Sequence, residues 1–115
     1  MITMDERRVE PRMMCADMVE VFWRDHTGKR RHAMALLEDI GTSGACLQFE
    51  TPIPAGVVVA WHSPKLEFKG TVRYCKYREI GYFVGVVFIA SSKWSKSVYR
   101  PQHLFDPRRL EQKAP

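Results

Sequence analysis

The sequence has no long apolar run and no segment that looks like an export signal. Its longest purely apolar stretches, such as residues 57–61, are far shorter than the roughly 20 residues that a membrane-spanning helix needs. The first twelve residues are polar and charged, without the apolar core of a secretory signal peptide. These absences argue against a membrane protein and against secretion, and they predict a cytoplasmic location.

Metal-ligating residues are few and widely spaced. The chain has three cysteines and four histidines. The cysteines are Cys15, Cys46 and Cys75, and the histidines are His26, His32, His62 and His103. None of them forms a Cys-x-x-Cys or His-x-x-x-His arrangement. We therefore expect no metal site, and we interpret the cysteines as buried, reduced thiols.

The chain is basic, but the excess charge is not concentrated where a nucleic acid would need it. The formal net charge is +5 and the sequence pI is about 9.3. Residues 1–12 hold three arginines against three acids, whereas residues 24–31, 65–80 and 90–115 each carry a positive excess. Charge spread over turns and a tail is more typical of a solvated surface than of a groove that follows phosphates.

Alternation with a period of two dominates the body of the chain. Apolar and polar residues alternate over residues 15–23, 45–50 and 66–74, and turn residues separate these segments from others at 32–37, 56–61 and 81–89. The pattern predicts an all-β domain formed by residues 13–90, with about six antiparallel strands arranged as a barrel or a sandwich. We expect residues 1–12 to form a flexible arm, and residues 91–115 to form a basic tail that packs on the barrel and has room for one short helix.

Three motifs occur in an informative order. An Arg-x-x-x-Arg motif, Arg8 to Arg12, follows Arg7 and precedes the first expected strand. A turn runs from Asp39 to Gly44 about thirty residues later, and Gly-Val-Val-Phe closes the last expected strand at residues 85–88. Together these features resemble the PilZ family over about residues 7–90. The resemblance implies a free-standing PilZ-type barrel that binds the bacterial second messenger cyclic di-GMP. It also implies that the signal passes to a protein partner, since no effector domain is fused to the barrel.

The resemblance also assigns roles to individual residues. Arg8 and Arg12 would hold the phosphates and stack on guanine, with Arg7 adding a further contact. Asp39 would accept hydrogen bonds from a guanine edge, and the turn would support it through Thr42, Ser43 and Gly44. Arginine suits this ligand, because its planar fork binds phosphate or the O6 and N7 atoms of guanine and its flat face stacks on a base.

The turn departs from the family pattern at one position. The family's Asp/Asn-x-Ser-x-x-Gly motif places its serine where this chain has Gly41. Loss of one hydrogen bond costs on the order of 1 kcal/mol, or roughly fivefold in affinity. We therefore expect weaker binding rather than none.

Other interpretations remain open from the sequence alone. The arginines can be a solvated tail paired with neighbouring acids, and residues 39–44 can be simply a tight connection between strands. The chain can then be an interaction barrel that does not bind nucleotide, with the aromatic and basic tail as a docking surface. A third alternative is a small nucleic-acid-binding barrel that uses Phe68, Tyr74 and Tyr77. No nucleophile accompanies His103 and Asp106, so we do not expect an enzyme.

Overall fold

The computed structural model describes residues 12–64, 66–89, 94–95, 100–101 and 105. These residues form six strands and no helix. The strands are β1 (Met13–Arg24), β2 (Arg30–Ile40), β3 (Gly44–Phe49), β4 (Val58–His62), β5 (Glu67–Arg78) and β6 (Gly81–Phe88). The described part of the chain thus contains no helix that could span a membrane.

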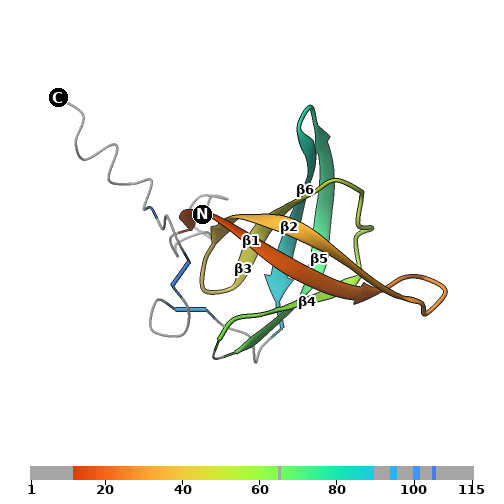
Figure 1. The fold of residues 1–115 in the computed structure, drawn as a ribbon, viewed down its shortest axis with the longest axis horizontal. Helices are drawn as coiled ribbons and strands as arrows, with labels where there is room; N and C mark the ends of the chain where they lie inside the picture. The colour runs from red at the N-terminus through yellow and green to blue at the C-terminus, as the bar shows by residue number, and fades with distance from the viewer. Residues whose placement is uncertain (1–11, 65, 90–93, 96–99, 102–104, 106–115) are drawn as a thin grey trace, which may run out of the picture.

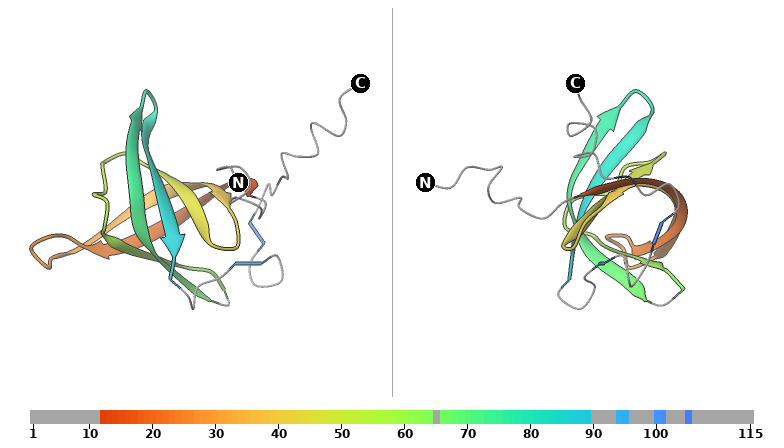
Figure 2. Two further views of the ribbon diagram at one scale, coloured as in Figure 1. Left: turned by 180° about the vertical axis from the view of Figure 1, so that it is seen from behind. Right: turned by 90° about the vertical axis from the view of Figure 1, so that its left-hand side faces the viewer.

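The six strands close into one antiparallel barrel in the order β1-β2-β3-β6-β5-β4 (Figure 1). In the right-hand view of Figure 2 the strands curve round into a ring. The predicted six-stranded antiparallel barrel is confirmed. Its closing contact, between β1 and β4, is short: Phe22 lies opposite Ala60 and Trp23 opposite Val59.

The interior is filled by the inward-facing residues of the alternating strands. Val59 and Trp61 on β4 are fully buried, as are Phe68 and Val72 on β5 and Val84 on β6. Three aromatic rings pack against one another there, with centroid separations of 5.4 to 5.9 Å. These rings belong to Trp61, Phe68 and Phe88. Burial of this apolar surface is the main force that holds the barrel together.

Three irregularities interrupt the strand pairing, and two of them shape the outer face near the candidate site. The register shifts between Leu37 and Asp39 where β2 pairs with β3, and between Val72 and Tyr74 where β5 pairs with β6. A third shift lies between residues 14 and 17 of β1. In a regular strand neighbouring side chains point to opposite faces, but an extra residue in a bulge re-aims them. As a result Tyr74 is exposed on the same face as its neighbour Arg73, where regular alternation would turn it inward.

Parts of the C-terminal tail contact the barrel. Trp94 is only 5% exposed and belongs to the core, and its backbone N–H donates to the carbonyl of Thr42 at 3.2 Å. Phe105 and Met14 exchange backbone hydrogen bonds of 2.6 and 2.7 Å. All of the predicted arm (residues 1–12) except Arg12 lies outside the described residues, as does most of the tail with its expected helix.

Candidate functional site

A line of four residues crosses four neighbouring strands on the outer face of the barrel. Asp39 on β2 lies opposite Cys46 on β3, and Cys46 lies opposite Gly85 on β6. Gly85 in turn lies opposite Tyr74 on β5. The bulges in β2 and β5 place Asp39 and Tyr74 on this line, which we call the floor of the site. Asp39, Gly85 and Tyr74 line the hollow described below, whereas Cys46 does not.

Arg12 and Asp39 form an ion pair at one end of this floor. The Arg12 Nη1 donates to Asp39 Oδ1 at 2.8 Å, and about a third of each side chain remains exposed. The guanidinium passes over Gly44, where an added Cβ would lie 3.2 Å from Arg12 Nη2 and would overlap the Val86 carbonyl. Gly44 therefore leaves space for the arginine. The structure brings together three of the residues that the motifs singled out.

A hollow of about 450 Å³ opens beside the ion pair. It is lined by Arg12, Asp39, Arg73, Tyr74, Gly85, Val86 and Val87. Arg73 provides a second cation, and it forms no ion pair with any residue that the structure describes. The sequence analysis missed Arg73, because it belongs to none of the three motifs and is one of several exposed basic residues on β5.

One hydrogen-bond donor of Arg12 has no acceptor within the described part of the protein. The Arg12 Nε is buried and finds no hydrogen-bond partner among the described residues. A buried donor without a partner costs roughly 1–3 kcal/mol, and such groups call for an explanation. A ligand with an acceptor oxygen would satisfy it.

The side chains of Tyr74 and Cys46 are close enough to influence each other's pKa values. Burial, reinforced by the charge of Asp39, raises the pKa of the Cys46 thiol to about 11. Burial also raises the pKa of Tyr74. Both groups are therefore neutral at physiological pH, and neither supplies a nucleophile there. The site carries its charge on Arg12, Asp39 and Arg73.

The turn residues Thr42 and Ser43 take part through their backbone. The carbonyl of Ser43 accepts from the Phe88 N–H at 2.8 Å, and the Gly41 N–H donates to the Gly44 carbonyl at 2.8 Å. Both hydroxyl-bearing side chains are exposed, and neither residue lines the hollow. The turn thus positions Asp39 and Gly44. The other two predicted arginines, Arg7 and Arg8, lie outside the described residues.

No protein-family model matches this chain, and none of the curated proteins is similar to it in sequence. Within the described ranges, no group of three or more histidine, cysteine or acidic side chains is placed to hold a metal ion. The geometry of the outer-face site is therefore the main guide to function.

Proposed function

We propose that this chain is a cyclic di-GMP-binding signalling domain of the PilZ type. The observation that carries the proposal is the ion pair of Arg12 with Asp39 over Gly44, at the edge of an open hollow. These residues are far apart in the sequence, and they come from the two motifs on which the resemblance rests. The PilZ resemblance itself rests on sequence motifs, and the fold agrees with it at the level of a six-stranded barrel.

The residues of the hollow match the chemistry of the ligand. The Arg12 guanidinium can bind a phosphate oxygen or guanine O6 and N7, and Arg73 adds a second positive charge to the lining of the hollow. Asp39 can accept hydrogen bonds from the N–H groups of a guanine edge. Tyr74 is 44% exposed, and the Lys76 ammonium lies over its ring, 5.4 Å from the centroid. If Lys76 moves aside, the ring can stack on a base.

The position of Arg12 suggests how binding becomes a signal. Arg12 directly precedes β1, so the segment that carries Arg7 and Arg8 begins at the edge of the hollow. In this proposal Arg7 and Arg8 close over the bound ligand, and this change in the arm is the signal. A protein partner that recognises the closed arm would then respond to the messenger.

The test is a calorimetric titration of the full chain with cyclic di-GMP at moderate salt. We expect binding by the wild type, a loss of at least tenfold in affinity for Arg12→Ala, and no detectable binding for Arg8→Ala/Arg12→Ala. A charge-assisted hydrogen bond contributes about 1.5–3 kcal/mol, which is the source of the tenfold figure. Arg30→Ala, at the far end of β2 from Asp39, is the matched control and should bind normally. Absence of heat with the wild type would refute the proposal. The remaining alternative would then be a barrel that binds a protein partner and no nucleotide.

The structure does not favour the alternative of a nucleic-acid-binding barrel. Phe68, one of the three aromatic residues considered for base stacking, is fully buried in the core. Tyr77 is exposed, but its ring packs against Tyr82 with centroids 5.1 Å apart. The three rings therefore do not form a continuous stacking platform.

A further inference from the structure

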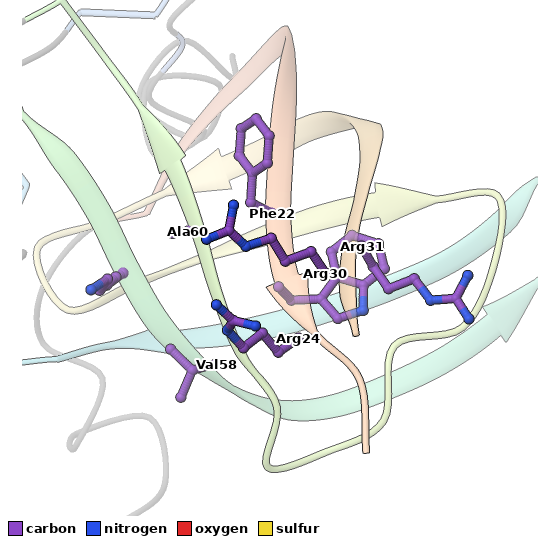
Figure 3. Close-up of a pocket in the computed structure, with 8 residues that line it drawn as sticks. Phe22, Arg24, Arg30, Arg31, Val58 and Ala60 are labelled. Carbon is purple, nitrogen blue, oxygen red and sulfur yellow. The ribbon is translucent and has the colours of Figure 1, made fainter. Parts of the chain in front are cut away.

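The barrel has a second hollow of about 510 Å³ on a different part of its surface, where β1, β2 and β4 meet (Figure 3). It is lined by Phe22, Trp23, Arg24, Arg30, Arg31, Val58, Ala60 and Lys69. Four of these eight residues are cations and none is an acid. The floor between the cations is apolar. The hollow shares no residue with the Arg12–Asp39 site.

Two of the cations face each other directly. Arg24 on β1 lies opposite Arg30 on β2, and in Figure 3 both side chains extend toward β4 while Arg31 extends away. Like charges directly opposite on paired strands destabilise a sheet. Arg31 is held by Asp25 at 2.9 Å, but neither Arg24 nor Arg30 forms an ion pair with a residue that the structure describes. The fold thus holds together two positive charges that repel each other.

The hollow continues into a row of exposed side chains along β1 and β2, which we call the outer ladder. It consists of Met18, Glu20, Phe22 and Arg24 paired with Leu36, Met34, His32 and Arg30. Met18, Met34 and Phe22 are 59%, 53% and 42% exposed. Exposed methionines and aromatics gathered on one face are typical of protein-binding surfaces, because methionine adapts its shape to a partner.

The charges along the ladder indicate which kind of partner fits. Glu20 lies in its middle, 3.2 Å from His32, and Glu67 lies beside Lys69 at 3.8 Å. A polyanion such as RNA, or an anionic membrane, would place phosphates or lipid against these carboxylates. A protein segment can instead place apolar side chains against the methionines and acidic side chains next to Arg24 and Arg30. From Met18 to Arg24 the ladder measures about 20 Å, the length of a short peptide segment.

We propose that the outer ladder and the hollow at its arginine end bind a protein partner that presents an apolar segment ending in two or more carboxylates. Arg24 and Arg30 pair with those carboxylates, and Met18, Phe22 and Met34 cover the apolar residues. The partner's carboxylates reduce the repulsion between the two arginines when the partner binds. This inference does not depend on nucleotide binding at the Arg12–Asp39 site.

The experiment is a selection of random twelve-residue peptides displayed on phage against the purified full chain. We expect enrichment of sequences with apolar residues next to two or more acidic residues. The enriched peptide should bind Arg24→Glu/Arg30→Glu at least tenfold more weakly, and its lysine-substituted version should bind that variant better than the wild type. Met34→Ser should weaken binding without changing its salt dependence. Lys76→Glu/Arg78→Glu makes the same change in net charge on β5 and should bind the peptide normally.

Several results would overturn the proposal. One is enrichment of peptides without acidic residues, and another is equal binding by wild type and Arg24→Glu/Arg30→Glu. A third is arginine-dependent binding of a polyuridine 12-mer, or of phosphatidylglycerol-containing vesicles, in the absence of any peptide binding. If the double reversal fails to fold, Arg24→Gln/Arg30→Gln replaces it, with the same expected loss of peptide binding. Cyclic di-GMP titration of the Arg24/Arg30 variants should match the wild type, which separates this site from the other one.

Discussion

The ring of Tyr74 on β5 occupies the space that a side chain at position 85 of β6 would need. A Cβ built on Gly85 would overlap the ring. The two residues lie directly opposite each other across the paired strands. Aromatic residues commonly cover a glycine on a neighbouring strand in this way. The ring therefore lies over Gly85, and both residues belong to the floor of the site.

We expect Gly85→Ala to push the Tyr74 ring outward, because the added methyl group has no other space to occupy. Overpacking of this kind costs roughly 1–3 kcal/mol in unfolding free energy. Urea unfolding followed by tryptophan fluorescence measures this loss, and titration with cyclic di-GMP should show weaker binding. In Tyr74→Ala/Gly85→Ala the clash is gone, so the two single losses should not add. Additive losses would show that the ring is not what excludes a side chain at position 85.

We expect Gly41→Ser to strengthen cyclic di-GMP binding about fivefold. The substitution places a hydroxyl where the PilZ pattern has one, and one additional hydrogen bond contributes about 1 kcal/mol. Calorimetry on wild type and variant measures the ratio of the two affinities. Binding that is unchanged or weaker would mean that the hydroxyl of serine at this position does not reach the ligand.

The protein should lose stability as the pH rises above about 9. Burial raises the pKa of Cys15 to about 12 and that of Cys46 to about 11, whereas a thiol in the unfolded chain titrates near 8.5. Between these values the folded chain retains protons that the unfolded chain releases, so higher pH favours unfolding. The stabilisation is complete below the unfolded pKa and is lost toward the folded values. Urea midpoints at pH 8, 9, 10 and 11 test this.

The control for the pH dependence is a variant without the two buried thiols. Cys15→Ala/Cys46→Ala will be less stable at every pH because it leaves space in the structure. Its urea midpoint should fall less between pH 8 and 11 than that of the wild type. Parallel curves for the two proteins would assign the alkaline loss to tyrosine and lysine residues instead.

Arg30→Glu should stabilise the barrel while it removes peptide binding. The substitution replaces a repulsive Arg24–Arg30 pair by an attractive cross-strand pair, which is worth about 0.2–1 kcal/mol. Thermal unfolding should show a higher midpoint at low salt, and the difference should shrink as salt screens the charges. A lower midpoint would show that the two arginines do not repel each other in the folded protein.

Phe68→Ala should cost about 3–5 kcal/mol, a large part of the stability of a domain of this size. Phe68 is fully buried between Trp61 and Phe88, and its loss leaves a cavity among the rings. Urea unfolding measures the effect. Tyr77→Ala, an exposed aromatic on the same strand, is the control and should cost far less.

The fold could be predicted from the sequence because each strand buries one face. Ala45, Leu47 and Phe49 alternate with polar or outward residues, and the structure buries all three on β3. The turn chemistry between the strands limited the possible architectures to antiparallel ones. Periodicity therefore predicted about six antiparallel strands, and the resemblance to the PilZ family favoured a barrel over a sandwich.

The site was harder to predict, because it depends on bulges that have no clear sequence signal. Asp39 and Gly44 were identifiable from their motif, and Arg12 from its spacing. Arg73 was not, since plain alternation places it among several exposed basic residues of β5. The pairing of Arg24 with Arg30 depends on the register of a hairpin, which the sequence does not specify to the residue.

The contact between β1 and β4 that closes the barrel is short, and we call it the seam. Two residue pairs close it, whereas β1 and β2 pair along nearly their whole length. Amide protons along this line should exchange with solvent through local opening before those of β3 and β6. Phe22 and Ala60, which face each other across the seam, also line the arginine-rich hollow. A peptide bound in this hollow would contact both strands of the seam and hold them together. Amide protons of β1 and β4 at the seam should then exchange more slowly than in the free protein.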